Sequence, residues 1–325
     1  MRVSARIFIE CAFVYAISSF FQLSSYLNTS KVTIESKPIP PHLKEDQHKK
    51  NLIVINTIGK RNNLVLMEHA RRNIFSRDKW DCIAFMISDE EEVPNDDPYL
   101  RALQDELKCS VPRTPFLHWG DLLHFITPTL VSNYNYVGLL LDDIFLPHEG
   151  EKAFKPDVLL ERMKRYNIGS IQPSVENDTH GMIKRSITRG LDNCVAMSGI
   201  IETYLQFFTP EAWQCYYSNL HHKGSKGWCY DVCFRKKCPH FILAQDFTMK
   251  VFHMDRNTKS LPYHDKSVVV PKNMKWTPGE PLESKYKDLD YLTVCESCGI
   301  KTSESGQITF PQNSMKLTRI SCYKN

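Results

Sequence analysis

Short apolar runs alternate with segments of helical periodicity in the first half of the chain, and this alternation constrains the fold more than any other feature. The strand-length apolar runs lie at 52–55, 82–87, 136–141 and 168–171. Apolar residues recur at helical spacing over 64–74, 100–107, 121–131 and 158–166. Strands that alternate with helices favour βαβ units. We therefore predict one α/β domain over residues 51–265, with a mainly parallel sheet and helices on both faces.

The N-terminus carries an apolar segment, residues 7–27, preceded by Arg2 and Arg6. A helix of about 20 residues spans the roughly 30 Å hydrocarbon core of a bilayer, and the two arginines favour a cytosolic tail at residues 1–6. The pattern predicts the transmembrane signal anchor of a type II membrane protein. Because the uninterrupted run 11–21 also has the length of a cleaved signal peptide, a secreted protein remains the alternative. Both interpretations place the rest of the chain in the secretory lumen, at the Golgi or endoplasmic reticulum membrane in the first case.

Two further regions flank the predicted domain. Residues 28–50 are polar and proline-containing, which is typical of a stem linker. Residues 266–325 lose the periodic pattern and are predicted to form an irregular, cysteine-bearing C-terminal extension. Glycosylation sequons at Asn28 and Asn177 agree with a lumenal glycoprotein, since this triplet is modified only after translocation.

In the secretory lumen, cysteines are expected to form disulfides. Of the 11 cysteines, Cys11 lies in the apolar segment, and the remaining ten are an even number in an environment where disulfides form. Cys229, Cys233 and Cys238 with His240 could be drawn as a zinc site, and Cys295-x-x-Cys298 resembles half of a zinc knuckle. Neither pattern is completed by a second pair of ligands, so disulfides are the favoured prediction.

Charge and motifs exclude several function classes. The chain has 41 Lys and Arg against 37 Asp and Glu without a run of five like charges, which argues against a nucleic-acid partner. It contains no Gly-x-Ser-x-Gly, Walker or Rossmann glycine motif. The sequence therefore gives no motif that would indicate a hydrolase, an ATPase or a dehydrogenase.

Three acids and a histidine are the candidate site residues. Asp142 and Asp143 follow the apolar run 137–141, and ligands of open α/β sheets bind beyond the carboxyl ends of strands. Two such acids can hold Mg²⁺ or Mn²⁺, which can bridge the phosphates of a nucleotide; the alternative is a solvated turn. Asp231 can serve as a general base, or simply begin a helix. His253 ends an apolar stretch and can complete a metal shell, or be a satisfied, partly buried histidine.

Five segments in the right order resemble domain-of-unknown-function family 707. They are 118–144, 170–174, 201–215, 227–231 and 246–253. The family resembles nucleotide-diphospho-sugar transferases of the GT-A type, often type II membrane proteins. The resemblance covers about residues 50–260.

The resemblance implies roles for the candidate residues. Asp143 corresponds to the final acid of the Asp-x-Asp-like motif, which binds the donor's metal, and Asp142 to the middle position. Asp231 falls at the acid that activates or positions the acceptor, and His253 at the metal-binding histidine. Leu141 departs from the motif, because an acid is expected at its first position.

These expectations together describe a metal-dependent transferase. The resemblance implies transfer of a sugar from a nucleotide-diphosphate donor to a hydroxyl of a glycan or glycoprotein, assisted by Mn²⁺ or Mg²⁺. The missing acid at Leu141 leaves open a non-catalytic lumenal protein that binds sugar or nucleotide on the same scaffold. A disulfide-rich interaction module without nucleotide affinity is a third possibility.

We predict that residues 7–27 remain in the mature protein, because the segment approaches spanning length and lacks a clear cleavage site. After expression in a cell with a secretory pathway, the protein should stay in the membrane pellet on carbonate extraction. Release of a soluble chain beginning near residue 28 would instead identify a cleaved signal peptide.

Overall fold

The computed structural model describes residues 48–87, 90–114, 119–176, 182–220 and 229–254, together with Cys295, Cys298, 301–302, 308–309 and 316–323. The predicted anchor, nearly all of the predicted stem and both sequons lie outside these residues. Among the helices that are described, none combines the length and the apolar character needed to cross a bilayer.

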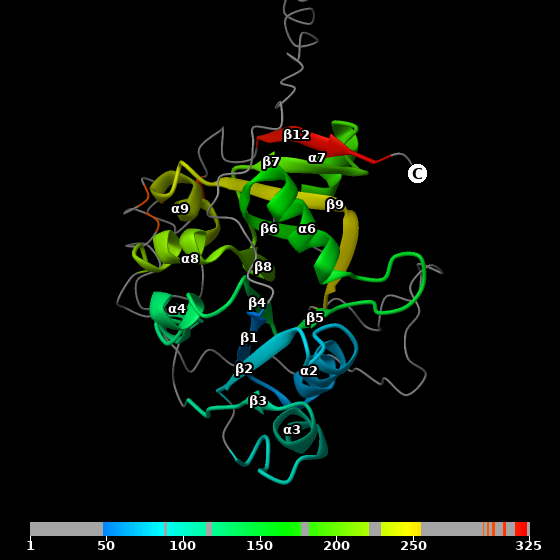
Figure 1. The fold of residues 1–325 in the computed structure, drawn as a ribbon, viewed down its shortest axis with the longest axis vertical. Helices are drawn as coiled ribbons and strands as arrows, with labels where there is room; N and C mark the ends of the chain where they lie inside the picture. Colours follow the sequence, from blue (N-terminus) through cyan, green and yellow to red (C-terminus); the bar gives the residue numbers. More distant parts are fainter. Residues whose placement is uncertain are drawn as a thin grey trace, which may run out of the picture. The chain divides into compact units, whose positions relative to one another are not determined.

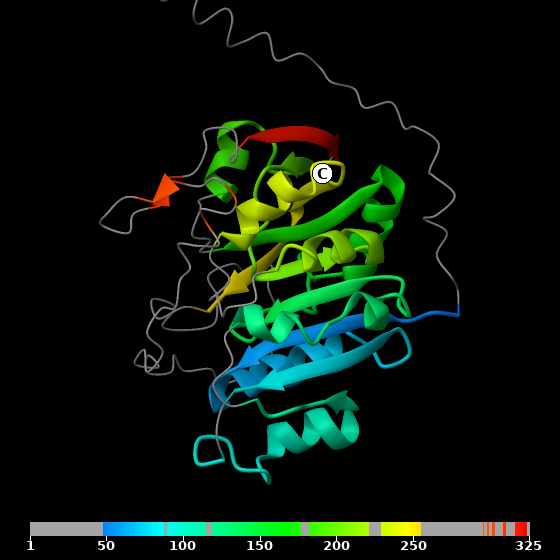
Figure 2. The same ribbon diagram turned by 90° about the vertical axis from the view of Figure 1, so that its left-hand side faces the viewer.

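The described residues form one ten-stranded sheet and one small two-stranded sheet. Strands of the large sheet, from one edge to the other, follow the order β12-β7-β9-β6-β8-β4-β1-β2-β3, and β5 pairs with β9. Figure 2 shows this succession, with β12 near one edge and β2 near the other. The bounds are β1 Asn51–Ile58, β2 Trp80–Met86, β3 Cys109–Ser110, β4 Val137–Leu141, β5 Ile144–Phe145, β6 Ile168–Glu176, β7 Cys194–Ser198, β8 Leu205–Phe208, β9 Ile242–His253 and β12 Leu317–Cys322; the small sheet pairs β10 Lys301–Thr302 with β11 Ile308–Thr309.

The large sheet is mixed, and the prediction of a mainly parallel sheet is wrong. Strands β3, β2, β1 and β4 are parallel to one another, as are β6 and β9. Strand β8 is antiparallel to both β4 and β6, and β7, β12 and β5 also pair in antiparallel fashion. The four residues of β8 are all buried, and a short buried run carries no periodic signal of strand direction.

Helices lie at each of the four predicted segments, and three further helices were not predicted. The described helices are α2 Arg61–Asn73, α3 Pro98–Arg101, the π-helix η2 Ala102–Glu106, α4 Trp119–Leu123, α5 Pro128–Val131, α6 Pro156–Tyr166, α7 Met182–Thr188, α8 Pro210–Tyr217 and α9 Tyr230–Lys237. The three that were not predicted are α7, α8 and α9. The predicted helix over 121–131 is two helices instead. The Thr127 side chain caps α5 by accepting a hydrogen bond from the Leu130 amide. Pro128 occupies the first helical position, where an N–H would have no partner within the helix and its absence costs nothing.

Alternating side chains of β1 divide the core into two layers. Ile53 and Ile55 lie in a cluster with residues of α2 and α6, whereas Leu52 and Val54 lie in a second cluster with residues of α4, α5, α8 and α9. Figure 1 shows α8 and α9 on one side of the sheet and α2 on the other. The prediction of helices on both faces is therefore confirmed.

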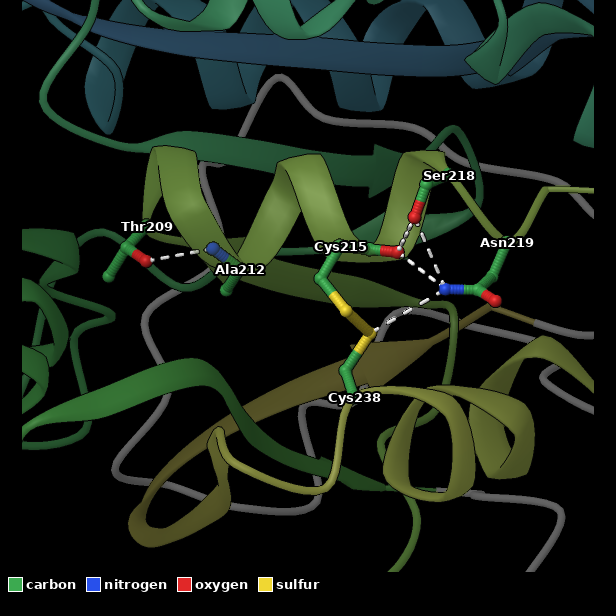
Figure 3. The surroundings of a disulfide bond; sticks show 6 residues. All are labelled: Thr209, Ala212, Cys215, Ser218, Asn219 and Cys238. Atoms are coloured by element: carbon green, nitrogen blue, oxygen red, sulfur yellow. Dashed lines mark hydrogen bonds between the residues drawn. A yellow bond between two sulfur atoms is a disulfide. The ribbon is translucent and has the colours of Figure 1, made fainter.

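All ten cysteines beyond the apolar segment are described, and they form five disulfides: Cys82–Cys109, Cys194–Cys322, Cys215–Cys238, Cys229–Cys295 and Cys233–Cys298. The disulfide prediction is confirmed, and the zinc alternative at Cys229, Cys233 and Cys238 is wrong. In Figure 3 the Cys215–Cys238 bridge joins α8 to the end of α9, and the Asn219 amide donates to the Cys215 carbonyl at 2.7 Å. This number of disulfides is typical of an oxidising lumenal or extracellular environment.

The C-terminal region is not irregular throughout. Residues 317–322 form β12, which pairs with β7 and is joined to it by the Cys194–Cys322 disulfide. The predicted irregular extension is corrected here. Only Leu317 of β12 is buried, so the strand lacked the apolar signal that identifies core strands.

His69 is buried between α2 and the segment that follows β5. Its Nε2 lies 3.0 Å from the Leu146 carbonyl, its Nδ1 lies 3.1 Å from the Asn73 amide, and its ring stacks on Phe145. Both ring nitrogens are thus satisfied by a neutral imidazole that donates from Nε2. Burial lowers the pKa of His69 to about 4, with a smaller contribution from His148 in the same direction.

We predict that His69 makes the protein less stable in mild acid. A histidine whose folded pKa is lowered binds fewer protons in the folded state than in the unfolded state, so its contribution to stability is lost as pH falls from about 6.5 towards 4. Between pH 7.5 and pH 5.0 the loss from this residue should be about 2 kcal/mol. Urea unfolding of the wild type and of His69→Gln at both pH values measures it. An equal pH dependence of the two proteins would contradict the assignment.

Candidate functional site

The acid pair occupies the turn between β4 and β5. Strand β4 is buried along most of its length and ends at Leu141, and β5 begins at Ile144. Asp142 and Asp143 therefore lie at the carboxyl end of a central strand, which is where open α/β sheets bind ligands. The sequence predicted this placement.

Asp143 and His253 face each other although 110 residues separate them. The Asp143 Oδ2 lies 3.1 Å from the His253 Nε2. Backbone pairing fixes this approach, because Ile144 is the register partner of His253 and the Met254 amide donates to the Asp143 carbonyl at 2.8 Å. The Tyr204 ring covers the imidazole, with 4.5 Å between ring centroids. In the described part of the chain, the buried Asp143 Oδ1 has no hydrogen-bond partner.

Asp142 is directed towards the turn between β1 and α2. Its Oδ2 accepts hydrogen bonds from the Gly59 amide at 2.8 Å and from the Asn63 side chain at 2.7 Å. Burial, with a further contribution from neighbouring Asp143, raises the pKa of Asp142 to about 7, while the bonds from Asn63 and Gly59 oppose the rise. Asp142 thus fixes the start of α2 against the acid turn.

Asn56 stands next to Leu141, the position at which the family resemblance predicts an acid. It is the register partner of Leu141 on the neighbouring parallel strand. Its side chain is fully buried, and neither amide atom has a hydrogen-bond partner among the described residues. Leu141 itself packs against both core clusters. At the level of Leu141 the polar group is therefore the uncharged amide of Asn56 on β1.

Asp231 lies in the first turn of α9, and its side chain is outside the described residues. The structure thus brings together Asp142, Asp143 and His253 of the predicted residues and leaves the role of Asp231 a prediction. Sequence reasoning missed Asn56, Asn63 and Tyr204. Asn56 did carry a signal, since it is the first polar residue after the apolar run 52–55 and marks the carboxyl end of β1.

The Asp143–His253 pair fits a divalent cation bound together with a phosphate ligand. Neighbouring ligands of an octahedral Mg²⁺ or Mn²⁺ lie about 3 Å apart, since each bond is about 2.1 Å long. The pair meets this spacing, and the buried Asp143 Oδ1 offers a further oxygen. Within the described residues there is no group of three or more His, Cys, Asp or Glu side chains that could hold a metal ion. Mg²⁺ is commonly held by one or two carboxylates together with substrate phosphates and water.

Neither a family model nor a curated protein matches the chain. Among solved structures, one that is similar is the mannosyltransferase PcManGT from Pyrobaculum calidifontis in complex with GDP-Man and Mn²⁺, at 13% identity and a TM-score of 0.44, covering 77% of this chain and 67% of that one. Another is GalNAc-T7 with UDP, GalNAc and Mn²⁺, at 12% identity and a TM-score of 0.46, covering 63% of this chain and 43% of that one. At this level of similarity the two structures do not establish the function of the chain, and the resemblance to family 707 stays a prediction.

We predict that Asn63 is required to hold the buried Asp142 carboxylate. Asn63→Ala removes one donor to a desolvated acid and should lower the free energy of unfolding by about 1–3 kcal/mol. Asn63→Asp should destabilise more, because it adds a like charge beside Asp142.

The order of the two variants is the informative result. An acid near a helix N-terminus is ordinarily stabilising, so a general effect on α2 would make Asn63→Asp the more stable of the two. Urea unfolding at pH 8, where Asp142 is mostly ionised, measures both. A more stable Asn63→Asp variant would rule out the Asp142 contact as the main role of Asn63.

Proposed function

We propose that the protein is a glycosyltransferase that moves a sugar from a nucleotide-diphosphate donor to a hydroxyl of a glycan or glycoprotein, assisted by Mn²⁺ or Mg²⁺. One observation carries the proposal. The carboxylate of Asp143 and the imidazole of His253, 110 residues apart in the sequence, lie 3.1 Å apart at the carboxyl end of β4. The neighbouring Asp143 oxygen is buried and, among the described residues, unpaired, so the site can accept a cation.

Asp143 and His253 would hold the divalent cation in this proposal. When bound, the cation supplies positive charge that stabilises the leaving nucleotide diphosphate. Asp142 would act as a positioning residue. It accepts hydrogen bonds from Gly59 and Asn63, and these bonds hold the β1–α2 turn against the turn that carries Asp143.

The start of α2 suits the diphosphate. The helix has 13 residues, begins at Arg61 directly after Lys60, and has no acid in its first turn. No side chain of the described residues caps it at Lys60. Its amide groups and its positive end therefore favour a bound anion, and the Asp142–Asn63 bond places this end beside the acid turn.

Asp231 is the proposed general base towards the acceptor hydroxyl. It belongs to α9, whose Tyr230 packs near Tyr216 of α8, on the sheet face opposite α2. The role rests on the family resemblance, and general-base catalysis contributes about 10²–10⁴-fold to a rate.

The site of action in this proposal is the lumen of the Golgi or endoplasmic reticulum, with residues 7–27 as the membrane anchor. The five disulfides support an oxidising compartment. Secretion after cleavage of the N-terminal segment is the alternative location.

A non-catalytic sugar- or nucleotide-binding protein is the second candidate function. Leu141 at the first position of the acidic motif favours it, because a leucine offers no oxygen to a metal or a ribose. The second candidate binds the sugar or the nucleotide and differs from the first in having no turnover.

We predict that Asp143→Asn abolishes metal-dependent nucleotide binding while the fold stays intact. The carboxamide keeps the shape of the side chain and loses the charge that a divalent cation requires. With UDP or GDP at about 100 times its Kd and Mn²⁺ present, binding should stabilise the wild type by about 2.7 kcal/mol, and this gain should vanish in the variant. Thermal-shift titrations of both diphosphates, with and without Mn²⁺, measure it.

Two further variants complete the experiment. Asp96→Asn changes an exposed acid outside the site and should bind like the wild type. Asp231→Asn should bind the donor normally but lower turnover by about 10²–10⁴-fold. A wild type that binds no nucleotide diphosphate with Mn²⁺ or Mg²⁺ would refute the transferase in favour of a binding protein for sugar alone, whereas nucleotide binding without turnover would favour the second candidate.

A further inference from the structure

The sheet face that α8 and α9 cover changes from apolar to polar along its strands. Alternate residues of β1 on this face are Leu52, Val54 and then Asn56. The first two pack in the apolar cluster with α4, α5, α8 and α9, and Asn56 does not belong to that cluster. The face is therefore built for helix packing at one end and for a polar contact at the other.

The same change occurs on three more strands. On β8, Leu205 and Phe207 lie in the opposite core layer, which puts Gln206 on the α8/α9 face. On β6, Ile171 lies in the opposite layer, and the adjacent Gln172 takes the α8/α9 face. On β9, Leu243 lies in the α8/α9 layer, so Gln245, two residues further, shares its side.

The strand register brings the three glutamines together and places Asn56 on the same face, two residues further along β1. Gln172 is the direct register partner of Gln245 on the parallel strand β9. The antiparallel pairing of Ile171 with Phe207 sets Gln172 beside Gln206 of β8. Gln206 is paired with Leu139 of β4, whose partner on β1 is Val54, so Asn56 lies two residues beyond the level of Gln206. Four strands thus each contribute one amide side chain to the same face, and we call Asn56, Gln172, Gln206 and Gln245 the amide row.

The amide row is buried and largely unsatisfied. The exposed fractions of its members lie between 0% and 2%. Gln206 donates through Nε2 to the Ile201 carbonyl at 2.8 Å. Among the described residues, the Gln206 Oε1 and both amide atoms of each other member have no hydrogen-bond partner. Buried amides are normally paired, so a group of unpaired ones on one face requires an explanation.

We propose that the amide row is the floor of a binding site for the hydroxyl groups of a sugar. Each amide offers two donor hydrogens and an acceptor oxygen, which match hydroxyls that both donate and accept. The row carries no charge, so it favours a neutral ligand over a phosphate. This inference rests on the proposed function, which it deepens by assigning the sugar to a place distinct from the metal and diphosphate.

The row borders the Asp143–His253 pair, as a sugar attached to a metal-bound diphosphate requires. Asn56 is the register partner of Leu141, directly before the acid turn. At the other side, Gln206 lies two residues after Tyr204, whose ring covers His253. The Asp143–His253 pair and the uncharged amide row thus lie next to each other without sharing a residue.

The structural alternative is an amide ladder between Gln172 and Gln245. Their direct pairing would allow one amide to donate to the other after rotation of the side chains. Such a ladder would stabilise the sheet and would have no effect on a ligand. The two explanations predict opposite effects of replacing both glutamines by leucine.

The test compares the full-length wild type with the double variant Gln172→Leu/Gln245→Leu. Gln104→Leu is the matched control, since Gln104 is exposed on η2. Affinities are measured with Mn²⁺ for UDP, GDP, UDP-glucose, UDP-galactose, UDP-N-acetylglucosamine and GDP-mannose. We expect the double variant to unfold at a temperature no lower than the wild type, to bind UDP and GDP within twofold of it, and to lose about tenfold of the preference for a sugar nucleotide over its diphosphate.

A lower unfolding temperature with an unchanged preference would overturn the inference in favour of the ladder and leave the proposed function standing. If the double variant does not fold, Gln245→Met keeps the length of the side chain and should lose about threefold of the preference. An unchanged preference in Gln245→Met would count against the inference in the same way.

A second arm separates the two proposals. If the wild type binds no nucleotide, the proposed function fails, and saturation-transfer NMR with glucose, galactose, mannose and N-acetylglucosamine tests the amide row alone. A signal that is present in the wild type and in Gln104→Leu but absent from the double variant Gln172→Leu/Gln245→Leu would support a sugar site without transferase activity. Absence of a signal for all four sugars in the wild type would overturn the inference as well.

Discussion

Strand β4 is the element on which the rest of the structure depends. It pairs in parallel with β1 on one side and antiparallel with β8 on the other, so the parallel and mixed parts of the sheet are joined through it. Close packing leaves no freedom at its centre. A Cβ at Gly138 would lie 2.9 Å from the Ile53 Cδ1 and 3.0 Å from the Phe207 ring, which explains the glycine within an otherwise aliphatic strand. Because β4 is held so tightly, the acids that follow it are held as well.

Local patterns predicted the parts of the fold that local physics determines. The apolar runs of β1, β2, β4 and β6 and the helical spacing of α2 and α6 are properties of short segments, and the structure confirms them. Strand direction and order are not local. The four buried residues of β8 carry no pattern that distinguishes an antiparallel from a parallel neighbour. In β12 only one residue is buried, so its sequence does not identify it as a strand of the sheet. The disulfide partners likewise depend on tertiary structure, since Cys194 and Cys322 are 128 residues apart.

The candidate site also contains features that local sequence predicts and features that depend on tertiary structure. A strand end followed by two acids was readable from the sequence. The structure places Asp143 3.1 Å from His253, the two residues to which the resemblance assigns the metal. The contacts of Asp142 with Gly59 and Asn63 were not readable, because they require the geometry of the β1–α2 turn. The amide row required even more, namely the register of four strands. Its traces in the sequence are Asn56 after the apolar run 52–55 and a single glutamine inside each of three apolar runs, which signal polar groups without showing which face of the sheet they occupy.

The amide row and the disulfides are connected through stability. A buried polar group that lacks a partner costs about 1–3 kcal/mol, and domains of ordinary size have only about 5–15 kcal/mol of net stability. Such a row therefore requires stabilisation elsewhere. A disulfide typically contributes about 2–4 kcal/mol, and Cys215–Cys238, Cys229–Cys295 and Cys233–Cys298 all tie together the helices and chain segments on the face of the sheet that carries the row. An oxidising compartment thus permits this fold to keep buried amides that, among the described residues, lack partners, and a ligand rich in hydroxyl groups can supply the hydrogen bonds.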